Sequence, residues 1–493
     1  MRHVLLSAHF DLVKTPQRLA FLEHVQAALP EDVQLVAFNL SGEARASFPV
    51  VVGYERRPDA PRDAAERLRR RLGLVLDTRA DSIFEHAVGE ISALGGNVDR
   101  QIMGFLGKVD RFIATLDKHS VVHCYLWNQF NAFHAFAEVL LRQRGIGVSF
   151  FHDGVLPGSI ALDFDGEMGA SWVSARPELL TDVPVDDEQV TAARQFLLWA
   201  SNRNISRHEQ VEKILVAESL ELAGLAGKKV IFYAGQNDWH AGIQPDGKRR
   251  MLHSPLYASS TAPLEDLDRI AQAHDWAVVF KPHPLDRDKY VFLRAGDYER
   301  TLILVSTDVN ACIAASDVVV TIASQTAYLA AMSGKPVVML GKNQLSGKGL
   351  TYDVHDVDDL EEQLITAMAD PLRASRSSDL ARHAAQLERA YLFDYGLYDY
   401  EFYTRGPRQA AALIAYAIGR APDETIAGIL RVARGGTLDA PMVAAGRPAV
   451  FDGEVLPAEV DVGDHESVPE SVVTAAVASV DDELPPSAMA RAD

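Results

Sequence analysis

The chain has 493 residues, of which 48% are hydrophobic and 24% charged, and its formal net charge is −20. This length exceeds what one hydrophobic core usually serves, so we expect two domains with additional segments. The acidic balance argues against a nucleic-acid partner, and no apolar run approaches the length that a membrane-spanning helix needs.

Cysteine usage and the first residues indicate a compartment. Cys124 and Cys312 are the two cysteines and each lies in an apolar stretch, so we expect no disulfide framework and a reducing environment. The start, MRHVLLSAHF, enters a strand-like run without a cleavable leader pattern, which predicts a cytoplasmic protein. An arginine cluster at 62–71 is compatible with peripheral contact to the inner face of a membrane, although a solvated helix face is the commoner role of such a run.

The first half of the chain alternates apolar runs with helical periods. Strands are expected at 3–6, 33–38, 121–126 and 148–151, with helices such as 17–29 and 130–143 between them. This alternation predicts an α/β, doubly wound, Rossmann-like lobe over residues 1–185, with a helical insertion near 60–117. The polar segment 186–226 contains no strand candidate, so we expect a helical linker.

A second α/β series occupies residues 227–372. Its expected strands are 230–233, 277–280, 302–305, 318–321 and 337–340, and its expected helices lie near 264–274, 309–315 and 325–333. Helices near 360–369, 378–391 and 408–418 follow, and we expect those within 373–437 to pack back on the lobes.

The end of the chain, residues 438–493, has no periodicity. From Phe451 to Asp493 eleven acidic residues stand against one Arg, which accounts for −10 of the total charge. This composition predicts a disordered acidic tail. Two doubly wound lobes facing a central cleft form the GT-B architecture, which serves glycosyltransferases and nucleotide-sugar epimerases alike, so the fold does not decide the activity.

The segment AVVFKPHP, residues 277–284, joins a buried strand to a cationic corner. Lys281 and His283 place an ammonium and an imidazole at the carboxyl end of the strand, where parallel sheets open into a ligand crevice. Pro282 and Pro284 fix φ near about −65° and so pre-shape the corner. The segment predicts a phosphate-binding corner, and a strand exit with solvated side chains is the alternative.

A second candidate anion site follows the strand expected at 318–321. Ser324, Gln325 and Thr326 fall in the first turn of the next helix. Unpaired backbone N–H groups and the helix dipole favour an anion there, and the hydroxyls add donors. This turn suits the phosphate of a nucleotide sugar. An ordinary helix cap at Ser324 is the alternative.

Several segments together resemble the bacterial capsular polysaccharide synthesis family. In the second half the similar segments are KPHP, SQTAYLAAMSGKPVVMLG, GKGLTYDV and, with the family's Gln-x-x-Asp stretch, YAGQNDWH. In the first half LWNQFNAF resembles the family's Trp-Asn turn and FFHDGVLPGSIALDFDGEMGAS its acidic-Gly-x-x-Pro segment. The segments lie in the family's order over roughly residues 120–172 and 228–353.

The resemblance implies a GT-B glycosyltransferase of surface polysaccharide or glycolipid biosynthesis. The family includes retaining β-Kdo transferases, which use CMP-Kdo, so the implied partners are a nucleotide sugar and a glycan or lipid-linked acceptor. The donor would be bound by Gln236, Lys281, His283, Pro284, Ser324, Gln325 and Thr326, and the acceptor by Trp127, Asn128 and Gly154. We expect no resident cofactor and no essential metal, because the DFD sequence at 163–165 precedes Gly166 in what the pattern predicts to be a hairpin turn.

Glycosyl transfer needs a carboxylate beside the anomeric carbon and a stabilised leaving phosphate. Asp153 is the first candidate for the carboxylate, because Gly154 lets backbone and substrate approach closely. By the resemblance, Asp153 would be the nucleophile of a retaining reaction. Asp238 is the second candidate, as a base or as a ligand-orienting acceptor, and His283 with Lys281 would neutralise the leaving phosphate. For both aspartates a turn-stabilising role is the alternative.

Two positions depart from the family pattern. Leu329 stands where related transferases often carry a ribose-binding Glu, and His152 stands where an acidic residue commonly precedes the Asp. These departures keep open a nucleotide-sugar-binding protein without catalysis. Two further alternatives are a cytidine-nucleotide-dependent polymerase-type transferase for sialic acid or glycerol phosphate, since such enzymes also use His-Pro corners, and a nucleotide-sugar epimerase on the same fold. The sequence does not identify the donor sugar, the acceptor, the linkage or the oligomeric state.

Overall fold

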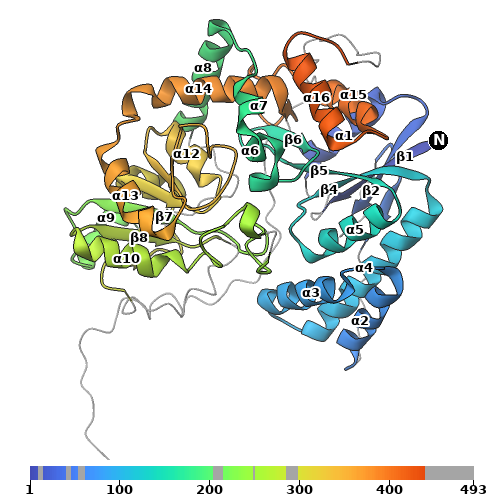
Figure 1. The fold of residues 1–493 in the computed structure, drawn as a ribbon, viewed down its shortest axis with the longest axis horizontal. Coiled ribbons are helices and arrows are strands. Elements are labelled where there is room, and N and C mark those ends of the chain that lie inside the picture. The colour runs from blue at the N-terminus through green and yellow to red at the C-terminus, as the bar shows by residue number, and fades with distance from the viewer. Residues whose placement is uncertain are drawn as a thin grey trace, which may run out of the picture. The chain divides into compact units, whose positions relative to one another are not determined.

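The computed structural model describes residues 1–8, 15–39, 46–53, 62–203, 215–247, 250–284 and 298–438. Except for Leu438, the predicted acidic tail lies outside these residues. The described segments contain two β-sheets with helices around them (Figure 1).

Within the described residues the first sheet has seven strands in the order β13-β6-β5-β4-β1-β2-β3. Their bounds are β1 Arg2–Ala8, β2 Val33–Asn39, β3 Val50–Val52, β4 Val121–Trp127, β5 Gly147–Asp153, β6 Ser159–Asp163 and β13 Leu392–Asp394. Strands β1 to β5 pair in parallel, whereas β6 runs antiparallel to β5, and β13 antiparallel to β6.

The second sheet, in the described part of the chain, has the order β12-β11-β10-β7-β8-β9, and all its strands pair in parallel. Their bounds are β7 Val230–Ala234, β8 Ala277–Lys281, β9 Thr301–Ile303, β10 Val318–Thr321, β11 Val337–Met339 and β12 Tyr352–Asp353. Strands β7, β8 and β10 are buried along their whole length. Continuous apolar runs of this kind are expected when helices cover both faces of a parallel sheet.

The two sheets share one strand order. In each, the first strand of the series, β1 or β7, lies between the second and the fourth, so that the chain reverses direction across the sheet at this strand. This is the doubly wound Rossmann-like order, in which ligands bind where the carboxyl ends of the first and fourth strands diverge. The predicted fold class, two doubly wound α/β lobes in the GT-B arrangement, is confirmed.

Side chains alternate across the first sheet as the period of a strand requires. Val4 and Leu6 of β1 belong to one apolar core, which also contains Phe21 of helix α1 (Pro16–Ala28). Leu5 belongs to the core on the other face, with residues of α5 (Ala132–Gln143) and α4 (Val98–Lys118).

The segment predicted as a helical insertion contains helices α2 (Ala64–Val75), α3 (Ala80–Leu94) and α4, which lie beside one another (Figure 1). The ring of Phe112 in α4 packs edge-on against Phe38 of β2, with the ring centroids 5.3 Å apart. The insertion is therefore anchored on the first sheet through aromatic contacts.

The remaining helices connect and cover the sheets. After β6 come a 3₁₀ turn at Met168–Ala170, α6 (Trp172–Ala175), α7 (Pro177–Thr181), α8 (Asp187–Asn202) and α9 (Val216–Leu222). Around the second sheet lie a 3₁₀ turn at Arg250–Leu252, α10 (Pro263–Ala273), α11 (Val309–Ala315), α12 (Thr326–Met332), a 3₁₀ turn at Val357–Asp359 and α13 (Leu360–Ala369). Among the described helices, none combines the length and the apolar character that crossing a bilayer requires.

Helix α14 (Arg373–Ala390) links elements of both sheets. The Tyr328 hydroxyl of α12 lies 2.9 Å from Nε2 of His383 in α14, and the chain then continues through Tyr391 into β13 of the first sheet. Helices α15 (Pro407–Ala417) and α16 (Pro422–Ala433) follow, and α15 packs against α1 (Figure 1).

Three strands of the first sheet, β3, β6 and β13, were not expected from the sequence. Strands β3 and β13 have only three residues each, so neither shows a readable period of two. Strand β6 follows β5 through a tight turn, and every one of its residues is buried, so polar and apolar residues do not alternate along it. Pairing with neighbours, rather than local pattern, defines these strands.

Candidate functional site

A cavity of about 770 Å³ is lined by residues from both lobes. This volume is within the range of small-molecule sites. Of the residues that the sequence analysis proposed for the site, eleven line the cavity: Trp127, Asn128, Asp153, Gly154, Gln236, Lys281, His283, Pro284, Ser324, Gln325 and Thr326. Asp238 does not line it.

Lys281, the last residue of β8, presents a buried cation to the cavity. The residue is only 8% exposed, and burial lowers the pKa of its ammonium, while Cys312 and Asp308 act in the opposite direction. Among the described residues no side chain forms an ion pair with this ammonium. A buried charge without a counter-ion is costly, so an anion in the cavity would be strongly favoured.

The other residues of the His-Pro corner follow directly. His283 is half-buried, Pro284 is exposed, and both line the cavity beside Lys281. The corner therefore lies at the carboxyl end of β8, where the sequence placed it. The His283 imidazole and the Lys281 ammonium therefore line the same cavity.

Gln236 lies two residues beyond β7 and bridges the ends of two strands. Its Oε1 accepts a hydrogen bond of 2.9 Å from the backbone N–H of Ala323, which follows β10. Its Nε2 is buried and has no hydrogen-bond partner among the described residues. Buried donors are rarely left unpaired in native proteins, so this amide marks a place for a ligand acceptor at the switch point of the second sheet.

The Ser324–Thr326 turn has an internal hydrogen-bond pattern. The Ser324 hydroxyl accepts from the N–H of Thr326 at 3.2 Å and donates to its Oγ1 at 3.1 Å. The N-cap of α12 is Gln325, without a side-chain cap bond, so Ser324 stabilises the turn before the helix rather than capping it, and both Ser324 and Thr326 line the cavity. Gln325 contacts the first lobe, because its Nε2 donates to the carbonyl oxygen of Gly154 at 3.4 Å.

Asp153 ends β5 and is held by Arg18, a residue that the sequence analysis did not propose. Nη2 of Arg18 donates to Oδ1 and Oδ2 of Asp153 at 2.8 and 2.7 Å, and Nε donates to Oδ1 at 3.1 Å. The guanidinium carbon lies 5.5 Å from the ring centroid of Trp127. All three residues line the cavity, so Asp153 is part of a charge-paired cluster in the first lobe.

The local backbone conformation explains why glycine stands at position 154 and asparagine at position 128. A Cβ at Gly154 would collide with the Ser159 side chain, so the turn between β5 and β6 requires glycine. Asn128 has a φ of 69°, a left-handed conformation that Asn tolerates better than most residues. Its Oδ1 accepts from the N–H of Phe130 at 3.0 Å, which stabilises the turn after β4.

Asp238 stabilises a loop of the second lobe. Its Oδ1 accepts from the backbone N–H of Ser260 at 2.9 Å and also from the Ser260 hydroxyl. Its carbonyl oxygen accepts from the N–H groups of Ile243 and Gln244, both at 2.9 Å. These contacts match the turn-stabilising alternative, and the structure gives no cavity position to this carboxylate.

Glu167 is a second cavity carboxylate that sequence reasoning missed. It follows β6, and its Oε1 accepts from the N–H of Gln129 at 2.8 Å. Burial raises the pKa of Glu167 to about 8, although the N–H groups of Gln129 and Asn128 act to lower it. The segment FDGEMG contains it, but only the structure shows that this acid is buried on the cavity wall.

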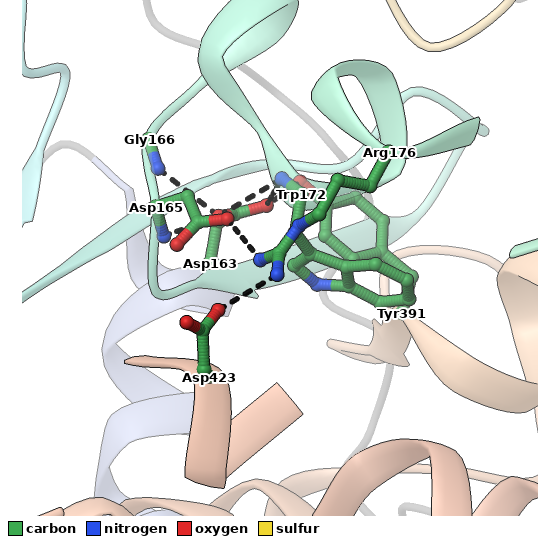
Figure 2. A network of polar contacts seen from close by, with 7 residues as sticks. All are labelled: Asp163, Asp165, Gly166, Trp172, Arg176, Tyr391 and Asp423. Carbon is green, nitrogen blue, oxygen red and sulfur yellow. Dashed lines mark hydrogen bonds and ion pairs between the residues drawn. The ribbon is translucent and has the colours of Figure 1, made fainter. Parts of the chain in front are cut away.

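Asp163 is the centre of the polar network in Figure 2, behind the cavity. Its Oδ1 accepts from the N–H groups of Asp165 and Gly166 at 2.9 and 3.1 Å, and Oδ2 accepts from the Tyr391 hydroxyl at 2.9 Å and from the Trp172 N–H at 3.2 Å. Burial raises its pKa to about 7, against these hydrogen bonds. The DFD segment thus forms a turn whose first carboxylate is saturated by protein donors.

The same network reaches two further parts of the molecule. Arg176 pairs with Asp165 and, at 2.7 Å, with Asp423 of α16 (Figure 2). The Tyr391 hydroxyl also lies 3.0 Å from Nε2 of His152, whose Nδ1 lies 3.0 Å from the carbonyl oxygen of Asp153. His152, the departure from the family pattern, therefore connects the backbone of Asp153 to the network. No cluster of His, Cys, Asp or Glu arranged to hold a metal ion occurs in the described residues.

Residues 251–386 match a family model described as capsule polysaccharide biosynthesis protein. The predicted resemblance to the capsular polysaccharide synthesis family is confirmed over this segment, which is less than half of the chain. Residues 251–386, called the capsule-family segment below, include the His-Pro corner and the Ser324–Thr326 turn. Gln236 and the first-lobe residues lie outside this segment. No curated protein sequence matches the chain.

Solved structures with similarity to the chain include two transferases and an epimerase. The KpsC β-Kdo 2,7 transferase of Thermosulfurimonas dismutans is 18% identical with a TM-score of 0.34, over 53% of this chain and 80% of that one. The KpsC β-Kdo 2,4 transferase of the same organism is 15% identical with a TM-score of 0.37, over 50% and 79%. The UDP-GlcNAc 2-epimerase of Methanocaldococcus jannaschii is 12% identical with a TM-score of 0.31, over 75% and 92%.

Proposed function

We propose that the chain is a glycosyltransferase that moves a sugar from a nucleotide donor to a glycan or lipid-linked acceptor in the assembly of a capsule-type polysaccharide or glycolipid. The observation that carries this proposal is the pairing, in one cavity, of anion-seeking groups of the second lobe with a carboxylate of the first. Lys281 and Gln236 are the anion-seeking groups, and Asp153 is the carboxylate. The capsule-family segment supports the same reading.

In this proposal the second lobe binds the donor phosphate. The Lys281 ammonium and the His283 imidazole neutralise charge on the phosphate oxygens, and the charge on the leaving nucleotide grows as the glycosidic bond breaks. The Gln236 amide donates to a phosphate or ribose oxygen. We propose a CMP-linked donor, with Kdo as its sugar, because the capsular resemblance includes transferases of that kind.

Asp153 is the proposed nucleophile. Its carboxylate oxygen forms a bond to the anomeric carbon while the bond from that carbon to the phosphate oxygen breaks, and the electron pair leaves with the nucleotide. The acceptor hydroxyl oxygen then attacks the same carbon and displaces Asp153, so two inversions give net retention. We propose that the ionised form of Glu167 accepts the hydroxyl proton; its pKa of about 8 makes this carboxylate a stronger base than an ordinary glutamate, although the group is mostly protonated at pH 7.

Binding of CMP, CDP and UDP to the purified protein, measured by calorimetry, tests the donor site. Lys281→Met should weaken the preferred nucleotide by about tenfold or more, because one charge-assisted contact is worth more than about 1.4 kcal/mol. Lys342→Met is the matched control, since Lys342 is exposed and does not line the cavity. Failure of every nucleotide to bind, or equal affinity in Lys281→Met, would contradict the proposal.

Turnover is tested with the nucleotide sugar whose nucleotide binds best. Release of free nucleotide should require an acceptor, and the anomeric configuration of the product, read by NMR, should equal that of the donor. Conversion of the donor into another nucleotide sugar without an acceptor, and without net release of nucleotide, would favour the epimerase alternative. An inverted product would remove Asp153 from the role of nucleophile while leaving transfer itself intact.

A further inference from the structure

Arg18 and Asp153 form an ion pair on the cavity wall, and this pair bears on how the reaction begins. Both carboxylate oxygens accept from the guanidinium, in a bidentate arrangement with one further bond from Nε. Hydrogen bonds from a cation draw charge from the oxygens and make them weaker nucleophiles. While it is paired with Arg18, Asp153 is therefore a weak nucleophile.

We propose that Arg18 is the residue that recognises a donor carboxylate, and that it exchanges Asp153 for that carboxylate when the donor binds. This inference rests on the proposed function. It assigns to Arg18 the choice of sugar class: a 2-keto acid sugar, whose anomeric carbon carries a carboxylate, rather than a neutral sugar.

The surroundings of the pair allow such an exchange. The side chains of Arg18 and Asp153 are 23% and 24% exposed, so an incoming group reaches them from the cavity without opening the core. Arg18 lies in the first turn of α1, and its guanidinium also faces the Trp127 ring at 5.5 Å. The ring contact holds the guanidinium in place independently of Asp153 and adds a cation–π contribution.

Charge within the first-lobe wall makes a cation necessary for an acidic sugar. Asp153 and Glu167 both line the cavity, and the negative charge of Asp153 is one of the causes that raise the pKa of Glu167. A donor carboxylate placed beside the ionised Asp153 without a counter-ion would be repelled. Arg18 is the arginine or lysine that the described part of the first lobe contributes to the cavity lining, whereas Lys281 and His283 lie on the second-lobe wall with the proposed phosphate position.

Partner exchange also places the reacting atoms. In a 2-keto acid sugar the carboxylate carbon is bonded directly to the anomeric carbon, so a carboxylate on Arg18 brings that carbon next to the oxygen that Arg18 has just released. Proximity of this kind favours attack by Asp153. A neutral sugar has no carboxylate to replace Asp153 on Arg18, so the Arg18–Asp153 ion pair remains intact and Asp153 remains a weak nucleophile.

Binding of CMP and of CMP-Kdo, measured in parallel by calorimetry, tests the exchange. Arg18→Met should lower the affinity for CMP-Kdo by about tenfold, the value of one charge-assisted pair, and leave the affinity for CMP unchanged. Arg18→Lys should restore part of the loss. Gln17→Met, at the exposed neighbouring position of α1, is the matched control and should bind both compounds as the unchanged chain does.

Asp153→Asn gives the sharper test because the sign of its effect is diagnostic. It removes the competing charge from Arg18, so CMP-Kdo should bind several-fold more tightly although turnover is lost, whereas CMP should bind as before. A purely structural ion pair predicts no gain for CMP-Kdo. This second variant also decides the question if Arg18→Met does not fold, which thermal unfolding of each variant will show.

The outcomes separate this inference from the proposed function. If the unchanged chain binds no cytidine nucleotide, the proposed donor fails first and the exchange falls with it. If the unchanged chain binds CMP-Kdo, but Arg18→Met binds it equally well or Asp153→Asn binds it no better, the exchange alone is overturned and the transferase proposal stands.

Discussion

The two walls of the cavity differ in how their polar groups are satisfied. On the second-lobe wall the Lys281 ammonium has no ion-pair partner among the described residues, and the Gln236 amide nitrogen is buried without a hydrogen bond. On the first-lobe wall Asp153 is paired with Arg18, and behind it Asp163 accepts from four donors. The unpaired donors of the second-lobe wall can bind a ligand without losing a contact within the protein. On the first-lobe wall the Arg18–Asp153 ion pair must separate before Asp153 can react.

The largest expected effect comes from removing the first-lobe carboxylate. Asp153→Asn should reduce turnover roughly 10⁴-fold or more, in line with the loss of a nucleophile in other enzymes, while the fold is kept. Turnover is followed as acceptor-dependent release of the nucleotide. Asp187→Asn, at an exposed position of α8, is the control. Residual turnover within tenfold of the unchanged chain would assign the chemistry to another group.

Breaking the network behind the first-lobe wall should cost folding stability. Tyr391→Phe removes the hydroxyl that serves both Asp163 and His152, so the free energy of unfolding should fall by about 2–3 kcal/mol, because a buried carboxylate loses a donor. Urea unfolding measures the change. Tyr398→Phe is the control, since the part-exposed Tyr398 takes no part in the Asp163 network. Equal stability of the two variants would mean that the network is not what holds this wall.

The buried acids of the first lobe should make stability depend on pH. Glu167 has a pKa of about 8 in the folded protein against an ordinary value of 4.5, so the folded state retains a proton that the unfolded state releases. Its contribution to stability is full below about pH 4.5 and is lost as the pH rises through 8. Glu167→Gln keeps the acceptor for Gln129 and should therefore flatten this decline, by roughly 1–2 kcal/mol.

The check is the free energy of unfolding of both proteins at pH 5 and pH 8.5. The raised pKa of Asp163, about 7, acts in the same direction, so some decline should persist in Glu167→Gln. A pH profile of unchanged slope in the variant would show that Glu167 is ionised in the folded protein at neutral pH.

The smallest expected effect concerns the unpaired donor of the second-lobe wall. Gln236→Met removes a nitrogen that has no described partner, so nucleotide affinity should fall about fivefold, which corresponds to about 1 kcal/mol. Gln244→Met is the matched control. Each variant loses one side-chain hydrogen bond within the second lobe, from the Ala323 N–H to Gln236 or from Gln244 Nε2 to the carbonyl oxygen of Ala258, but Gln244 does not line the cavity. Calorimetry should separate the two variants, and equal affinities would contradict the comparison.

Much of the second-lobe wall could be predicted because its residues follow strands that the sequence marks clearly. Val318–Thr321 and Ala277–Lys281 are continuous apolar runs, and the polar residues directly after each must emerge at the carboxyl edge of the sheet. Aspartate roles were harder to predict. Asp153 and Asp238 look alike in sequence, yet one ends a strand on the cavity wall while the other binds Ser260 within a loop.

By itself the sequence determined the doubly wound fold, the His-Pro corner and the capsule-family segment, because these depend on residue order within short stretches of chain. Only the tertiary structure decided which charges meet. Arg18 lies 135 positions from Asp153, and Tyr391 lies 228 positions from Asp163. Such pairs form because the strand order of the first sheet brings distant segments together, and local periodicity contains no record of that order.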